Sequence, residues 1–239
     1  RSTQSPRRQR QMCIRDRMEQ IKAAATVQKD VLQQTYRNRS EQRLQKALLP
    51  LVVIGASTGG PPVLEHILTQ LEKSPQAALV IVQHMPAQFT RSMAERLNEC
   101  CVCTVKEAEE GECLKAGVAL IAPGDFHVQL QQKRNQPVTV HLTTEAPIHG
   151  LRPAIDVTME SAARLNGTQV MGVILTGMGQ DGAQGMQAIK QAGGQTIVQA
   201  PASCVIDSMV QHALRRQVVD EVLLPEQIAR RIARLSVSS

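Results

Sequence analysis

The chain has 239 residues, of which 42% are hydrophobic, as expected for a globular protein with one good-sized domain and an appendage. It contains one tyrosine, two phenylalanines and no tryptophan. This scarcity argues against binding of single-stranded nucleic acid, which usually requires aromatic side chains for base stacking. The net charge of +6 arises at the N-terminus, because residues 1–49 hold 12 Lys/Arg and 4 Asp/Glu, and the remainder holds 15 and 17. We expect no nucleic-acid partner for the folded body.

The chain has six cysteines, and no histidines cluster at metal-ligand spacing. We therefore expect reduced cysteines, as in a cytosolic protein, with no metal and no cofactor. The sequence shows no signal peptide and no apolar run of the length that spans a bilayer. We expect a cytoplasmic protein that does not insert into a membrane.

The first 48 residues differ in character from the rest. Residues 1–17 lack apolar periodicity, and the string MCIRDR at residues 12–17 resembles translated sequencing-adapter sequence, so we predict a non-native tail. Residues 18–48 are helical and polar in pattern, with too few apolar residues for a core face. They indicate an interdomain linker helix or, alternatively, a partner-binding helix.

From residue 49 the pattern becomes strand, glycine-rich turn and helix, repeated, which predicts an α/β domain with a largely parallel sheet over residues 49–239. Segments 128–130 and 138–142 predict a small β-hairpin. The other predicted strands are 51–54, 78–82, 117–123, 171–175 and 196–199; the predicted helices follow Pro61, span 90–98 and 183–192, and begin at Pro153, at about Ser208 and at Pro225.

The first strand leads into G-A-S-T-G at residues 55–59, which fits the nucleophile elbow of serine hydrolases. A sharp strand-to-helix turn would expose the Ser57 hydroxyl. We expect the following helix to aim free N–H groups at the site, where they would favour an oxyanion. A phosphate- or dinucleotide-binding turn fits this motif equally well, although the full G-x-G-x-x-G and the Gly-Lys-Ser/Thr signatures are absent.

Two further residues complete a possible triad. His84 ends the strand after the first helix and should emerge at the same sheet edge as Ser57. A histidine at a strand end is often structural, but one beside an exposed serine suits a general base. Asp181 lies in the glycine-rich segment 176–182; it could orient His84, cap the helix that begins at Ala183, or do both. The order Ser, His, Asp differs from that of ordinary α/β-hydrolases.

At these residues the chain resembles the chemotaxis response regulator protein-glutamate methylesterases, the CheB family, over about residues 49–235. The similar motifs are residues 54–60, residues 83–86 with 89–90, residues 121–125, Arg152-Pro153 with Asp156, residues 172–182 and residues 202–205.

The resemblance implies a doubly wound, mainly parallel, Rossmann-like sheet with helices on both faces. It implies a catalytic triad of Ser57, His84 and Asp181, with Met178 and Thr58 at the reaction centre and the Met178 N–H as a candidate oxyanion donor. The implied activity is hydrolysis of glutamyl methyl esters, and deamidation of glutamines, on the cytoplasmic helices of methyl-accepting chemoreceptors. Segment 18–25 resembles the linker after the family's receiver domain, so we expect that domain upstream in the full-length protein.

The chain departs from the family pattern at Ala200-Pro201, where an acidic pair is usual, and at residues 208–210, where Gly-Met-Pro is usual. These changes concern loop geometry and substrate range rather than the triad. Two other functions remain open from the sequence. One is a non-catalytic nucleotide- or phosphate-binding α/β module, and the other is an intact esterase that acts on a receptor system outside chemotaxis.

Overall fold

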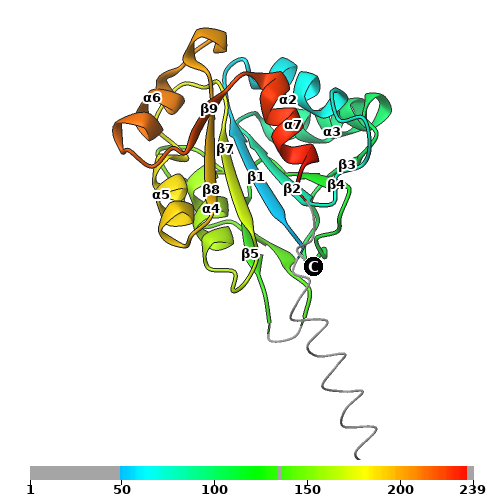
Figure 1. The fold of residues 1–239 in the computed structure, drawn as a ribbon. Helices are drawn as coiled ribbons and strands as arrows, with labels where there is room; N and C mark the ends of the chain where they lie inside the picture. Colours follow the sequence, from blue (N-terminus) through cyan, green and yellow to red (C-terminus); the bar gives the residue numbers. More distant parts are fainter. Residues whose placement is uncertain (1–48, 134–135, 236–239) are drawn as a thin grey trace, which may run out of the picture. The chain divides into compact units, whose positions relative to one another are not determined.

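The computed structural model describes residues 49–133 and 136–235 (Figure 1). The predicted tail over 1–17 and linker helix over 18–48 lie outside the described residues. Within the described part, no helix is long and apolar enough to cross a membrane.

The central element is a seven-stranded sheet in the order β3-β4-β2-β1-β7-β8-β9, and all its neighbouring strands are parallel. The innermost strands are buried at every position, which explains why they read as continuous apolar runs in the sequence. The predicted parallel sheet is confirmed. Its strands are β1 (Leu51–Ala56), β2 (Ala78–Gln83), β3 (Thr104–Glu107), β4 (Val118–Ile121), β7 (Val170–Ile174), β8 (Gln195–Gln199) and β9 (Glu221–Leu223).

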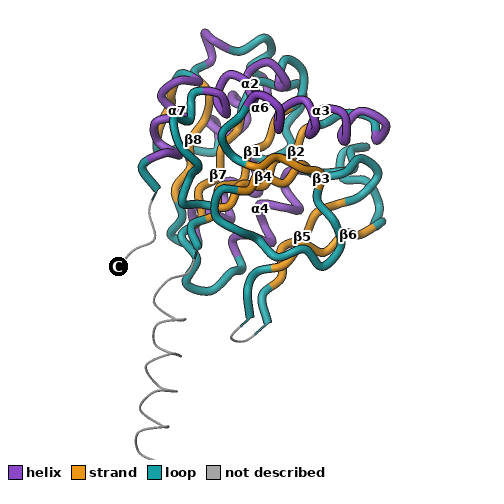
Figure 2. Tube along the Cα trace, turned by 90° about the vertical axis from the view of Figure 1, so that its right-hand side faces the viewer, coloured by secondary structure: helices purple, strands orange, loops and turns teal. Residues whose placement is uncertain are grey.

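Helices cover both faces of this sheet, as the resemblance implied (Figures 1 and 2). One buried cluster joins the sheet to α2 (Gly60–Thr69), α3 (Ala87–Cys100) and α7 (Pro225–Ala233). The other joins it to α4 (Ile155–Ala163), α5 (Ala183–Gln191) and α6 (Ser208–Arg215). A short 3-10 helix, Pro201–Ser203, follows β8. The core is almost entirely aliphatic, in agreement with the scarcity of aromatic residues.

The predicted hairpin is also present and consists of β5 (His127–Gln131) and β6 (Thr139–Thr143), which pair antiparallel. It is fixed to α4 by two buried hydrogen bonds. The Leu130 N–H donates to Ser161 Oγ at 2.9 Å, and the Thr158 hydroxyl donates to the Val128 carbonyl at 2.8 Å. The hairpin therefore supports the helix whose N-terminus reaches the candidate site.

Two edge strands and the ends of two helices differ from the prediction. Strands β3 and β9 have no predicted counterpart. They have only four and three residues, at a partly exposed edge of the sheet, and such short segments carry no clear periodicity. Helix α3 begins at Ala87 and ends at Cys100, rather than spanning 90–98, and α4 begins at Ile155, after Ala154 as its N-cap, rather than at Pro153. None of these differences affects the arrangement of the central strands.

The strand order has a topological switch point between β1 and β7. After β1 the chain continues to β2 on one side, whereas after β7 it continues to β8 on the other. Such switch points, at the carboxyl ends of parallel strands, are where open α/β sheets bind ligands. The Ser57 N–H donates to the Thr176 carbonyl at 3.0 Å, so the turn after β1 and the loop after β7 meet there.

Candidate active site

The turn that carries Ser57 is fixed by hydrogen bonds to the backbone of Ser57. Its carbonyl accepts hydrogen bonds from the Gly60 N–H and from Gln83 Nε2, each at 2.9 Å. Gly59 has φ 80°, and a Cβ at this position would lie 2.6 Å from Val205 Cγ2. Only glycine suits such a conformation in so little space. The turn leaves Ser57 half-buried and Thr58 exposed.

The expectation that the following helix aims free N–H groups at the site is wrong for its first three residues. The Gly60 N–H is used by the Ser57 carbonyl, and Pro61 and Pro62 have none. Anion binding at a helix N-terminus depends on such free donors. The phosphate-binding interpretation of this turn therefore loses its main physical support, and oxyanion donors must come from elsewhere.

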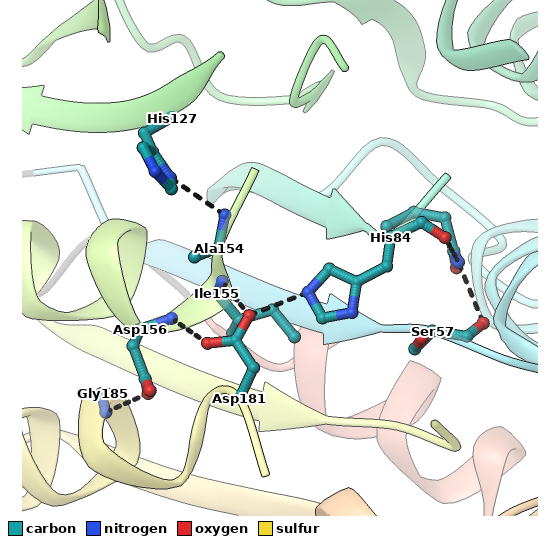
Figure 3. A network of polar contacts seen from close by, with 9 residues as sticks. Ser57, His84, His127, Ala154, Ile155, Asp156, Asp181 and Gly185 are labelled. Carbon is teal, nitrogen blue, oxygen red and sulfur yellow. Dashed lines mark hydrogen bonds and ion pairs between the residues drawn. The ribbon is translucent and has the colours of Figure 1, made fainter. Parts of the chain in front are cut away.

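His84 and Asp181 are in direct contact. His84 Nε2 lies 2.8 Å from Asp181 Oδ2, and the two side chains are 6% and 1% exposed. Figure 3 shows the imidazole between the Asp181 carboxylate and Ser57. The second ring atom, Nδ1, is buried and has no hydrogen-bond partner within residues 49–133 and 136–235. Because an ionised carboxylate only accepts, it fixes the neutral ring with its proton on Nε2 and leaves Nδ1 as a free base.

The Asp181 carboxylate also receives two backbone donors from α4. The Ile155 N–H donates to Oδ2 at 2.7 Å and the Asp156 N–H donates to Oδ1 at 3.0 Å. Burial alone would raise the pKa of Asp181, but the bonds from His84 and from these two N–H groups outweigh it and lower the pKa. Of the two roles left open for Asp181, capping of the helix from Ala183 does not occur: Gly182 holds the N-cap position of α5, and the Asp181 carboxylate caps α4 instead.

A second buried carboxyl group, Asp156, lies beside Asp181. Its Oδ1 accepts the Gly185 N–H at 2.7 Å (Figure 3). Burial, together with the negative charge of Asp181, raises the pKa of Asp156 to about 6 despite this backbone donor. The sequence marked Asp156 only as part of a family motif and gave it no role.

Gln83 connects the nucleophile candidate to the base candidate. Its buried amide Nε2 donates to the carbonyls of Ser57, at 2.9 Å, and of His84, at 3.0 Å. The His84 N–H in turn donates to the Ala56 carbonyl at 3.0 Å. A glutamine that ends an otherwise apolar strand was the one available signal for this role.

The loop after β7 brings its backbone against Ser57. A Cβ added to Gly177 would lie 2.7 Å from Ser57 Cβ, so only glycine permits this approach. Met178 follows. The residue is 68% exposed, and its N–H has no acceptor among the described residues. Ser208 holds the loop on both sides of Met178: its Oγ accepts from the Gly179 N–H at 2.9 Å and donates to the Gly177 carbonyl at 3.1 Å.

The structure therefore brings together every residue that the sequence singled out. Ser57, His84, Asp181 and the Met178 backbone lie at the edge of the sheet formed by the carboxyl ends of β1, β2 and β7. Thr58 is tied to the same loop, because its carbonyl accepts the Thr176 hydroxyl at 3.0 Å. Among residues 49–133 and 136–235, no group of three or more His, Cys, Asp or Glu side chains is arranged to hold a metal ion.

Comparison with known proteins decides the family. Residues 52–232 match the family model described as CheB methylesterase. The chain belongs to the CheB methylesterase family. The crystal structure of the catalytic domain of Thermotoga maritima CheB methylesterase superposes with a TM-score of 0.74 at 40% sequence identity, covering 77% of this chain and 97% of that one. The predicted family and fold class are thus confirmed.

Two curated relatives carry the name protein-glutamate methylesterase/protein-glutamine glutaminase. The one from Halalkalibacterium halodurans is 45% identical over 184 residues, which are 77% of this chain and 53% of the relative. The one from Salmonella typhimurium is 46% identical over 183 residues, which are 76% of this chain and 52% of the relative. This CheB-family chain spans about half the length of these relatives.

Proposed function

We propose that the chain is a serine hydrolase that removes methyl esters from glutamate side chains on the cytoplasmic helices of chemoreceptors, and deamidates receptor glutamines by the same route. The observation that carries the proposal is the 2.8 Å contact between His84 Nε2 and Asp181 Oδ2, with Ser57 on the other side of the ring. The names of the relatives supply the ester and amide substrates.

The first step is formation of an acyl-enzyme. Ser57 Oγ attacks the γ-carbonyl carbon of the methylated glutamate, and His84 Nδ1 takes the hydroxyl proton. Asp181 keeps the other ring nitrogen protonated and stabilises the imidazolium that forms. The tetrahedral intermediate carries an oxyanion. The donor we propose for it is the N–H of Met178, which no other described residue accepts. Methanol leaves with the proton from His84.

The second step returns the enzyme to its starting state. A water molecule gives its proton to His84 and attacks the glutamyl ester of Ser57, and the serine leaves as the protonated alcohol. The product is a glutamate with one more negative charge than the ester. With a glutamine substrate the leaving group is ammonia, and all other steps are the same.

The partners follow from this substrate. The chain would act in the cytoplasm on the chemoreceptor helices during chemotaxis adaptation, and the full-length protein would carry an N-terminal receiver domain. The length of the relatives supports the latter, since they are about twice as long as the matched segment. The departures from the family pattern at Ala200-Pro201 and residues 208–210 would allow a different range of receptor substrates.

The experiment that tests the nucleophile is covalent trapping. A fluorophosphonate probe should label the wild-type protein at Ser57, as located by mass spectrometry of the digested protein, and should not label Ser57→Ala. Because the probe needs no receptor, the result does not depend on the substrate. Labelling of another serine, with Ser57 unmodified, would contradict the proposed mechanism.

A further inference from the structure

Asp156 and Asp181 hold reciprocal positions at the N-termini of two packed helices. Asp181, which precedes α5, accepts the first two N–H groups of α4, at Ile155 and Asp156. Asp156, which lies in α4, accepts the N–H of Gly185 in the first turn of α5. Each carboxylate therefore caps the helix of the other segment (Figure 3).

Neither helix has a cap of its own. The N-cap residues are Ala154 for α4 and Gly182 for α5, and neither makes a side-chain capping bond. The first N–H groups of a helix require acceptors, and the loss of a capping side chain destabilises the helix. Both helix ends thus depend on the exchanged carboxylates.

Helices α4 and α5 are in close contact at Gly185. A Cβ at Gly185 would lie 2.4 Å from Met159 Cβ and 3.2 Å from Asp156 Cα. The chain that leads out of Asp181 is therefore held against α4 by close packing and by the Asp156 carboxylate. Since the Asp181 carboxylate in turn binds His84, a displacement of this chain would be transmitted to the imidazole.

We propose that the Asp156 carboxyl group is a positioning residue, which holds Asp181 in the orientation that fixes the tautomer and direction of His84. This inference rests on the proposed function of the triad. It assigns to Asp156 no contact with substrate.

The charged and titratable groups near Asp156 show which of them the Asp156 charge can influence. Asp181 faces it from the loop before α5, and His84 lies beyond Asp181 at the end of β2. His127 on β5 accepts the Ala154 N–H through Nδ1 at 3.1 Å, and Glu160 on α4 accepts a hydrogen bond from Gln184 of α5 on the exposed side. An ionised Asp156 would therefore favour the imidazolium of His84 through its proximity to the Asp181–His84 pair.

The test compares Asp156→Ala, Asp156→Asn and the control Glu160→Gln, which removes an acidic charge from the same helix and keeps the acceptor for Gln184. In Asp156→Ala, kcat for methanol release should fall about ten- to a hundredfold with KM nearly unchanged, as for other residues that orient catalytic groups. Asparagine keeps an acceptor for Gly185, so Asp156→Asn should regain most of kcat. Glu160→Gln should match the wild type.

The pH profile separates positioning from a merely structural role. Loss of the Asp156 charge makes the imidazolium less favourable, so the acid limb of kcat/KM in Asp156→Asn should shift by about half a unit to lower pH. A residue that only stabilised the fold would leave the limb where it is. An unshifted limb in Asp156→Asn, together with wild-type kcat in Asp156→Ala, would overturn the proposal.

A readout without substrate distinguishes this inference from the proposed function. In protein with 15N-labelled histidine, the Nε2–H of His84 should give a downfield proton signal that shifts in Asp156→Asn and weakens in Asp156→Ala. If the wild type releases no methanol while this signal responds, the proposed function fails and the positioning role stands. If Asp156→Ala does not fold, Asp156→Asn decides, and a signal and an acid limb identical to the wild type would refute the role.

Discussion

The Asp181 carboxylate binds His84 through Nε2, at 2.8 Å, so Nδ1 is the ring atom left to face Ser57. In the serine-protease arrangement the two ring nitrogens have the opposite assignment. The chemistry is the same, because either nitrogen can act as the base when the other is held protonated. Three donors converge on this one carboxylate, two from the backbone of α4 and one from His84.

This convergence makes Asp181→Asn a severe change. Asparagine has one acceptor oxygen for three donors, and its NH2 group would favour the ring with the proton on Nδ1, which removes the base. We expect kcat to fall on the order of 10⁴-fold, as in the comparable serine-protease variant. Methanol release gives the rate, and circular dichroism reports folding. Asp207→Asn, in the segment before α6, is the matched control; equal losses in both variants would contradict the assigned role.

The Gln83 amide should matter for catalysis as well as for stability. Gln83→Leu removes the donor that joins the carbonyls of Ser57 and His84. We expect a loss of about 1–3 kcal/mol in the free energy of unfolding, and a fall in kcat of roughly tenfold or more as the two groups lose their fixed separation.

Thr196→Val separates these two effects. Thr196 is buried and donates to the Val218 carbonyl at 2.6 Å, but it lies at the amino end of β8, away from the carboxyl ends of the strands where the candidate site is. The Thr196→Val variant should lose about as much free energy of unfolding as Gln83→Leu, measured by urea unfolding, and should keep wild-type kcat. A Gln83→Leu variant with undiminished kcat would refute the bridging role.

Ser208 should affect the geometry of the loop that carries Met178. Ser208→Ala removes the bonds to Gly177 and Gly179 on either side of Met178. We expect kcat to fall about tenfold through a less fixed oxyanion donor, with a change of less than about 1 kcal/mol in stability. Ser92→Ala, an exposed hydroxyl on α3, is the control. If Ser208→Ala and Ser92→Ala both retain full turnover, the loop does not need this support.

Asp156 should make stability depend on pH in an identifiable window. Because burial raises its pKa from 3.8 to about 6, the native state keeps a proton there that the unfolded chain has released. The free energy of unfolding should therefore fall as pH rises from 4 to 6, by about 3 kcal/mol at most. Asp181, whose pKa is lowered, acts in the opposite sense, and its contribution is lost only as pH falls below 3.8.

Urea unfolding of the wild type and Asp156→Asn between pH 4 and pH 7 measures this effect. Asparagine does not ionise, so the variant lacks the Asp156 contribution, and its stability relative to the wild type should rise with pH across the window. A difference that stays constant from pH 4 to pH 7 would show that Asp156 titrates normally.

The sequence predicted the central strands and the positions of Ser57, His84 and Asp181, because each of these depends on local signals. Apolar runs mark the buried strands, and glycines mark the turns that follow them. Residues at the carboxyl ends of parallel strands then meet at one edge whatever the details of packing.

The support around the triad could not be predicted in the same way. That Asp181 caps α4 rather than α5 depends on where a helix 25 residues earlier in the chain is packed. The reciprocal role of Asp156 depends on the same contact. The lack of free N–H donors at the start of α2 has two causes. One is Pro61 and Pro62, which are visible in the sequence. The other is the hydrogen bond from the Gly60 N–H to the Ser57 carbonyl, which only the structure reveals.

The most direct test of the central claim is methanol release from a methylated chemoreceptor, measured for the wild type and for Ser57→Ala under the same conditions. The proposed mechanism predicts release by the wild type and a rate roughly 10⁴–10⁶-fold lower in a folded Ser57→Ala variant, as in other serine hydrolases. Equal rates in the two proteins would show that Ser57 is not the nucleophile.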